Sequence, residues 1–300
     1  MTTVPLLLGT RQHRTLMGVR CEVSVIGGDA HTLTEEGLRL VADLEQLWSR
    51  FIPSSDICRI NRAGGEPVWV NTNTVSLIGH MIAAHTATHG AFNPTLLPHL
   101  IQRGDTRSLI DDKASTVSPL AHAFDDLSGI VIREDNTITL PEHMTLDAGG
   151  IGKGFAADLI VEHLISRGAE SACVNLGGDI RVARKTDTNH AWPIHIMSPI
   201  DPNNSLCTIS LAEGAVATSQ TAARHRADRG IDCHIASFDD APPAYIAASI
   251  IASTAAWAEA WTKCALLSDN NLNEGLGLSV LRVDNAGVVT QSDTWKVFLQ

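Results

Sequence analysis

The chain has 300 residues, which is enough to bury a large core in one large domain or in two lobes. Its net charge is −11 with only 22 Lys and Arg residues, which argues against a nucleic-acid or anionic-membrane surface. No apolar stretch reaches membrane-spanning length, and the first residues lack the basic segment of a secretory signal. The six cysteines stand far apart without a Cys-x-x-Cys pair, which favours reduced thiols and a cytoplasmic protein.

The first part of the chain reads as a strand followed by a helix. Residues 21–26 alternate and are β-branched, which predicts a strand. Thr32 and Glu35 have the spacing of a capping box, and apolar residues keep helical spacing from there to Phe51. We expect the helix to leave into a polar loop over residues 49–61.

The next segment predicts short elements and a second helix. A short strand is expected at residues 68–70, and Asn73 is expected to cap a helix that stops at Gly90. His85 and His89 are four residues apart on this helix, but we expect both on its polar face and predict no histidine metal site. A short helix near residues 96–101 and a surface loop or insertion over residues 103–125 are expected to follow.

The later elements are mostly strands. Two hairpins are expected, one from residues 130–132 and 137–140 and one from residues 171–176 and 180–183. Residues 253–267 are apolar nearly all round, which predicts a buried helix. Strands adjoin strands, so we predict an α+β fold with mixed, largely antiparallel sheets and flanking helices. Further strands are expected at residues 192–197, 206–211, 247–251, 278–283 and 288–290.

Residues 147–158 join a predicted strand, residues 136–146, to a predicted helix that Gly168 is placed to end. The turn is rich in glycine and contains Lys153. Glycines let the backbone approach a ligand, and the first amides of a helix attract phosphate. The pattern matches neither common nucleotide fingerprint, so a tight connection with a solvated lysine remains an equal alternative.

Seven motifs in one order resemble those of the ApbE-type FAD:protein FMN transferases, over roughly residues 15 to 282. The glycine-rich turn and the NLGGDI sequence are the most specific of them. The motifs are Met17-Gly18, SRFIPSSDICRIN (49–61), GAFNPT (90–95), DAGGIGKG (147–154), NLGGDI (175–180), VATS (216–219) and AEAWTK (258–263).

The resemblance implies one ApbE-like domain over residues 1–300, with a ligand cleft between two lobes. It implies transfer of FMN from FAD, with Mg²⁺, to a Thr or Ser of an acceptor protein, with release of AMP. The implied catalytic residues are Asp147, Lys153 and Glu259, and the implied metal ligands are Gly150 and Glu259. The implied FAD contacts are Met17, Phe51, Ala91, Phe92, Asn93, Asp147, Lys153 and the backbone around Ile235.

The sequence departs from the family pattern in three places. Residues 233–241 lack the family's Asp-Pro and Thr-Gly, and Asn93 stands where aspartate is usual. On the metal helix, Glu259 and Lys263 replace an Asp followed four residues later by Thr or Ser. Lys263 can pair with Glu259, swing out and leave magnesium bound, or put its ammonium in the metal's place. The alternatives to transfer are therefore an FAD-binding protein without transferase activity and an FAD pyrophosphatase.

Overall fold

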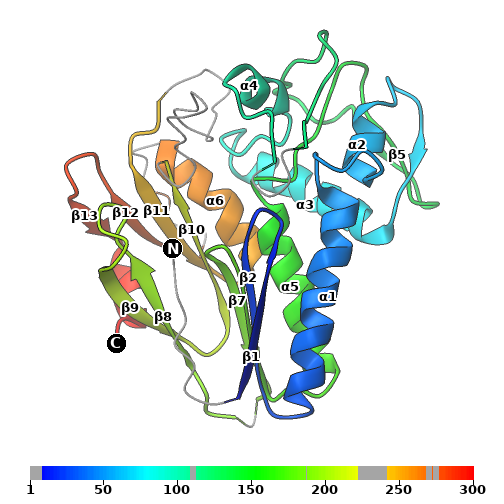
Figure 1. Ribbon diagram of the computed structural model, residues 1–300. Coiled ribbons are helices and arrows are strands. Elements are labelled where there is room, and N and C mark those ends of the chain that lie inside the picture. The colour runs from blue at the N-terminus through cyan, green and yellow to red at the C-terminus, as the bar shows by residue number, and fades with distance from the viewer. Residues whose placement is uncertain (1–8, 109–112, 187, 222–241, 268–271, 273–276) are drawn as a thin grey trace. The chain divides into compact units, whose positions relative to one another are not determined.

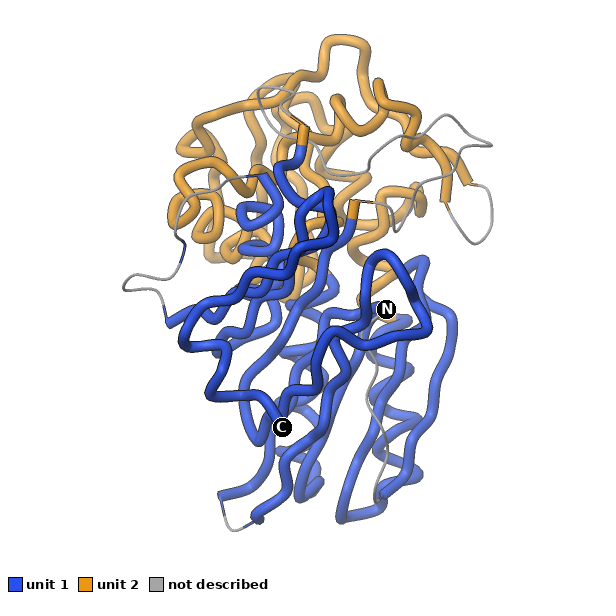
Figure 2. Tube along the Cα trace, turned by 90° about the vertical axis from the view of Figure 1, so that its left-hand side faces the viewer, with its two compact units in different colours: residues 1–42, 153–220, 243–300 blue, residues 43–152, 221–242 orange. Residues whose placement is uncertain are grey.

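A computed structural model of the chain resolves into two compact units, which are coloured separately in Figure 2. Unit 1 comprises residues 1–42, 153–220 and 243–300, and unit 2 comprises residues 43–152 and 221–242. The structure describes residues 9–108, 113–186, 188–221, 242–267, 272 and 277–300.

An eight-stranded sheet forms the centre of unit 1, and every neighbouring pair of its strands is antiparallel. The predicted α+β class with largely antiparallel sheets is thus confirmed. In spatial order the strands are β1 (Thr10–Leu16), β2 (Val19–Ile26), β6 (Ser171–Leu176), β7 (Asp179–Arg184), β10 (Gly214–Gln220), β11 (Ala247–Ala252), β12 (Ser279–Val283) and β13 (Val289–Gln291).

Helices cover one face of this sheet: α1 (Ala30–Trp48), α5 (Gly152–Ser166) and α6 (Ala255–Leu267) (Figure 1). Cys21, Val23 and Val25 of β2 are fully buried and, two residues apart, point to the same side of the strand. A Cβ at Gly37 of α1 would lie 3.0 Å from Val23 and 3.4 Å from Ile160 of α5. The two helices and the strand therefore pack tightly through a glycine.

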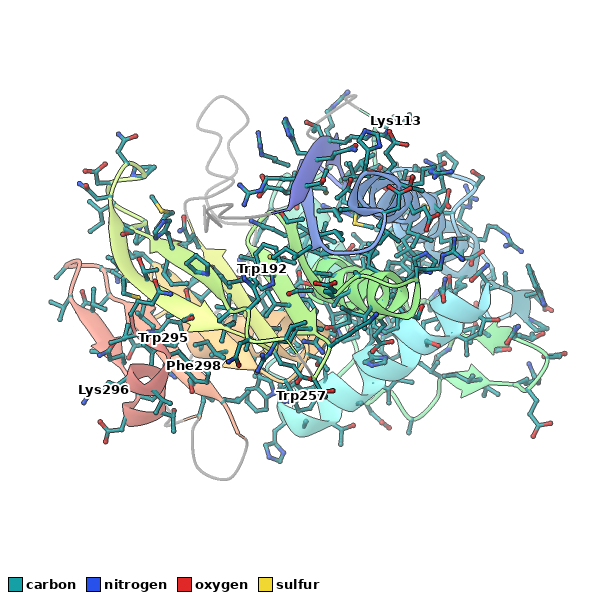
Figure 3. The ribbon with its side chains drawn as sticks, turned by 90° about the horizontal axis from the view of Figure 1, so that it is seen from below. Lys113, Trp192, Trp257, Trp295, Lys296 and Phe298 are labelled. Carbon is teal, nitrogen blue, oxygen red and sulfur yellow. The ribbon has the colours of Figure 1, made fainter. Side chains whose placement is uncertain are left out.

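The other face of the sheet carries the hairpin β8 (Trp192–Met197) and β9 (Ser205–Leu211), together with the 3-10 helix η3 (Asp293–Phe298). Trp192 and Trp295 are fully buried there and belong to one apolar cluster, with Phe298 against it (Figure 3). The Nε1 atom of Trp192 donates to Ser171 Oγ at 2.8 Å, so its polar atom is satisfied inside the core. Unit 1 thus has three layers.

Unit 2 contains short helices, one longer helix and a small three-stranded sheet in the order β3-β5-β4. Trp48, at the end of α1, donates to Thr74 Oγ1 at 3.2 Å and so fixes α3. The elements are α2 (Asp56–Asn61), β3 (Val68–Trp69), α3 (Thr72–Ala87), α4 (Leu97–Gln102), β4 (Val131–Ile132) and β5 (Thr137–Thr139).

Both predicted helix caps were wrong by a few residues. Asp29, not Thr32, caps α1: its carboxylate accepts from the Thr32 amide at 3.2 Å and from the Thr32 hydroxyl at 2.8 Å. Asn71, not Asn73, caps α3, with its side chain accepting from the Asn73 amide at 2.9 Å. In each case two residues with cap-type side chains lie within three positions of the helix start, and the sequence alone does not decide which of them caps the helix.

Several elements were missed or mispredicted. The exposed edge strand β1 and the strand β10 had no predicted counterpart, and the predicted loop over residues 49–61 contains the helix α2. The strand predicted over residues 136–146 is a strand only at Thr137–Thr139. The other predicted strands and helices are present within a few residues of their expected ends. Over the described part of the chain, no helix combines the length and apolarity needed to cross a membrane.

Candidate functional site

The glycine-rich loop before α5 is anchored in unit 2 by its backbone. The side chain of Asn61 donates to Leu146 O and accepts from the Leu146 amide, both at 2.8 Å. The next amide, that of Asp147, donates to Pro94 O at 2.8 Å. The 90–95 motif therefore binds Asp147, which opens the 147–154 motif, and the 49–61 motif binds the residue just before it.

Arg50 is the charged partner of this loop, and we had given it no role. Its Nη2 lies 2.7 Å from Asp105 Oδ2, and its Nε lies 3.8 Å from Asp147 Oδ1. Its guanidinium also stacks 4.7 Å from the centre of the Phe51 ring. The Arg50 side chain is only 6% exposed, so it is a fixed positive charge beside the Asp147 carboxylate. No local sequence pattern marks this long-range pairing.

The glycines of the loop let neighbouring atoms approach the backbone closely, and they do not serve to provide unusual backbone angles. None of Gly149, Gly150, Gly152 and Gly154 has a positive φ. A Cβ at Gly149 would lie 2.8 Å from Asp147 Oδ2, so the carboxylate folds over that residue. A Cβ at Gly154 would lie 2.2 Å from the carbonyl oxygen of Ala255 in α6. Gly154 is therefore required by the packing of α5 on α6.

Lys153, at the start of α5, sits between two buried carboxylates of unit 1. Its Nζ donates to Asp179 Oδ2 at 2.6 Å and to Glu259 Oε1. Asp179 is 4% exposed and Glu259 is fully buried, whereas the Lys153 side chain keeps 17% exposure. Burial alone lowers the pKa of Lys153, but the charges of Asp179 and Glu259 outweigh it and raise that pKa. Lys153 is thus a permanently charged ammonium.

The first turn of α5 is not left open for a ligand as we had expected. The amide of Gly154 donates to Glu259 Oε2 at 2.7 Å, so the Glu259 carboxylate caps this helix. The reverse also holds: Asp158 of α5 accepts from the amides of Ala255 and Ala256 at 2.8 and 2.9 Å and caps α6. The two helices therefore cap each other.

Asp158 is buried in this arrangement and Arg181 Nε lies 3.2 Å from it. Burial raises the pKa of Asp158 to about 6, against the lowering effect of the two amides and of Arg181. We had assigned Asp158 no role, and no spacing in the sequence marks a cap that reaches from one helix to another.

Lys263 points inward, so the alternative in which it swings out is not realised. Its Nζ donates to Ser219 Oγ at 2.9 Å, to Thr262 Oγ1 at 3.2 Å and to the Glu259 carbonyl oxygen at 3.3 Å. Its distance to Glu259 Oε1 is 4.0 Å, at the limit of an ion pair. The main partners of the Glu259 carboxylate are thus Lys153 and the Gly154 amide, not Lys263.

The residues at Glu259 do not fit the magnesium ion that the resemblance implies. One carboxylate oxygen accepts from an ammonium and the other from a backbone amide. A second ammonium, that of Lys263, stands at the position of the expected third ligand. Both oxygens would have to exchange donors for a cation, and two positive charges already lie there. Within the described residues, no group of three or more His, Cys, Asp or Glu side chains is arranged to hold a metal.

Asp179 has a larger role than the sequence suggested. We expected Asn175 and Asp179 to serve the hairpin turn, and Asn175 does so by accepting from the Gly178 amide at 2.8 Å. Asp179 instead binds Lys153 through Oδ2, while its buried Oδ1 has no hydrogen-bond partner. Burial and the nearby Glu259 charge raise the pKa of Asp179, against the opposing effects of Lys153 and Lys263.

The remaining predicted FAD contacts differ in how far they are buried and in the bonds that they make. Met17 is half-buried at the turn between β1 and β2, with a φ of 51°. In unit 2, Phe92 is 3% exposed, whereas Ala91 and Phe51 are half-buried. Asn93 donates to Phe124 O at 2.7 Å and accepts from Thr95, so both its polar atoms bind within unit 2. Ile235 and the 233–241 segment lie outside the described residues.

His85 was wrongly expected on a polar face. It is 9% exposed, and its Nε2 is buried without a hydrogen-bond partner. Burial lowers the pKa of His85, although Asp125 and Asp126 act in the opposite direction. His89 lies beyond the end of α3 with a φ of 51°, so the two rings do not share a helix face.

The family profile of ApbE matches residues 17–278, and the chain belongs to the ApbE family. A curated FAD:protein FMN transferase of Vibrio cholerae is 29% identical over 197 residues, which cover 64% of this chain and 58% of that protein. One of Treponema pallidum is 30% identical over 177 residues, covering 55% of this chain and 49% of that protein. The chain thus matches about half of the length of these relatives.

Solved structures share the fold at lower identity. The ApbE protein of Thermotoga maritima superposes with a TM-score of 0.83 at 24% identity, covering 98% of this chain and all of that one. The flavin transferase ApbE of Vibrio cholerae gives a TM-score of 0.76 at 20% identity, covering 97% of this chain and 100% of that one.

Proposed function

We propose that the protein transfers the FMN half of FAD to the hydroxyl of a threonine or serine in an acceptor protein and releases AMP. Membership of the ApbE family supports this, as do relatives that are named FAD:protein FMN transferases. The observation that carries the proposal is the Lys153 ammonium, held between Asp179 and Glu259 directly after the glycine-rich loop.

The chemistry asks for positive charge beside a diphosphate. The acceptor oxygen forms a bond to the FMN phosphorus, the bond from that phosphorus to the oxygen of AMP breaks, and the hydroxyl proton passes to solvent. Negative charge develops on the phosphate oxygens and on the leaving AMP. Lys153 is positioned by two carboxylates and stays protonated, so it supplies a fixed positive charge without reorganisation.

The loop residues have separate roles in this proposal. Asp147, held near Arg50, is a hydrogen-bond acceptor for FAD, and the backbone at Gly149 and Gly150 lies close to the nucleotide because no side chain intervenes. The other proposed FAD contacts follow the family pattern: Met17, Phe51, Ala91, Phe92 and the backbone around Ile235. We assign the Asn93 side chain to holding this region through Phe124.

The test is an incubation of the purified protein with FAD and a flavin-accepting protein domain. Transfer leaves fluorescent flavin on the acceptor after denaturation and produces AMP in equal amount. A matched reaction uses an acceptor whose threonine is replaced by alanine, and it should stay unlabelled. FAD bound but never transferred, or FMN and AMP formed equally without acceptor, contradicts the proposed transfer.

A further inference from the structure

The ammonium of Lys263 donates hydrogen bonds to oxygen atoms on α6 and β10. Its Nζ atom donates to the hydroxyls of Ser219 and Thr262 and to the backbone carbonyl of Glu259, at 2.9 to 3.3 Å. Hydroxyl, carbonyl and carboxylate oxygens are the ligands that hard cations such as Mg²⁺ prefer. An ammonium has three donors, and these three oxygens accept from it, so the side chain is fixed and only 18% exposed.

The charges of the cluster balance only because Lys263 is present. Asp179 and Glu259 contribute two carboxylates, and Lys153 and Lys263 contribute two ammonium groups. Without Lys263, two buried carboxylates would share one ammonium, and the buried Oδ1 of Asp179 would still lack a partner. Such a cluster would attract a cation, since uncompensated buried charge is strongly unfavourable.

We propose that Lys263 is a built-in cation that replaces the divalent metal, so that the protein handles the diphosphate of FAD with two ammonium groups alone. The proposal rests on the proposed function for the identity of the ligand, but not for the exclusion of metal. It follows that this chain needs no Mg²⁺ where the family pattern of Asp and Thr or Ser implies one.

The test compares the wild-type protein with Lys263→Thr, which restores the hydroxyl of the family pattern. Lys296→Thr is the matched control, because Lys296 (Figure 3) is an exposed lysine of the same unit that pairs with Asp293. Mn²⁺ binding is followed by electron paramagnetic resonance, and FAD binding by fluorescence titration in EDTA and in Mg²⁺. Circular dichroism checks that each variant is folded.

We expect the wild-type protein and Lys296→Thr to show no saturable Mn²⁺ binding and equal FAD affinity in EDTA and Mg²⁺. Lys263→Thr should gain one Mn²⁺ site, and its FAD affinity should rise at least about tenfold on adding Mg²⁺. A stoichiometric Mn²⁺ site in the wild-type protein, or an FAD affinity that falls about tenfold in EDTA, overturns the proposal.

If Lys263→Thr does not fold, Lys263→Arg keeps the charge, and the wild-type measurements still decide the matter. If the wild-type protein binds no FAD, the proposed function fails by itself. The Mn²⁺ measurement then still tells whether Lys263 excludes the metal, so the two failures are distinguishable.

Discussion

Replacing Gly154 by alanine tests the mutual capping of α5 and α6. The added Cβ would lie 2.2 Å from the Ala255 carbonyl oxygen and 2.7 Å from the Ala256 nitrogen. Both atoms belong to backbone, so no side-chain rotation relieves the overlap and the two helices must separate. Separation weakens the bond from Gly154 to Glu259 at 2.7 Å and those from α6 to Asp158 at 2.8 and 2.9 Å.

The expected change in the free energy of unfolding on Gly154→Ala is the sum of opposing effects. In an open helix, Gly→Ala stabilises by about 1 kcal/mol. Overpacking costs about 1–3 kcal/mol, and each hydrogen bond to a charged group contributes about 1.5–3 kcal/mol. With the overlap and at least one weakened cap, we expect a net loss of about 3 kcal/mol in the free energy of unfolding. For 300 residues the unfolding entropy is about 0.63 kcal/mol/K, so this loss lowers Tm by roughly 5 °C.

The assay is urea and thermal denaturation, with Gly79→Ala as the matched control. Gly79 lies within α3, and a Cβ there would meet nothing within 4 Å. The same substitution should therefore stabilise at that position, by about 1 kcal/mol. A Gly154→Ala protein as stable as the wild-type protein, or more stable, refutes the reasoning.

Two further substitutions test the buried charges of Asp158 and Arg50. The folded-state pKa of Asp158 is about 6 against an ordinary value of 3.8, so folding favours its protonated form. The stability advantage of the wild-type protein over Asp158→Asn should therefore shrink by up to roughly 3 kcal/mol as pH rises from about 4 to about 6. Urea denaturation of both proteins across this pH range measures the advantage. An advantage that grows with pH contradicts the raised pKa of Asp158. Arg50→Met leaves Asp105 and Asp147 without their buried cation, so we expect a loss of about 3 kcal/mol in urea denaturation. A stability equal to that of the wild-type protein would exclude Arg50 as their counter-charge.

The parts of the fold that sequence predicted well are those with a strong periodic pattern. The residues of α6 are apolar on nearly every side, which marks a buried helix, and ten of its positions are buried as expected. The strand β1 shows the opposite case: its polar sequence, from Thr10 to Leu16, suits an exposed sheet edge and has no apolar alternation to reveal it. The caps at Asp29 and Asn71 depend on which of two nearby side chains reaches an amide, and local spacing does not decide that.

In the candidate site, the sequence predicted only the residues that stand out from their local surroundings. Lys153 stands out because it lies in a glycine-rich turn, and Glu259 because a carboxylate inside an apolar helix needs a partner. That the two bind each other comes only from the fold. Asp179 resembled an ordinary turn residue, and its pairing with Lys153 spans strands and helices that no local pattern connects.

The most direct test of the central claim is titration of FAD and of riboflavin into the wild-type protein, Lys153→Met and the control Lys296→Met. If Lys153 binds the diphosphate, Lys153→Met should weaken FAD binding by about 10- to 100-fold. Its affinity for riboflavin, which has no phosphate, should change little, and Lys296→Met should match the wild-type protein for both ligands. Unchanged FAD affinity in a folded Lys153→Met protein, or equal losses for FAD and riboflavin, contradicts the account.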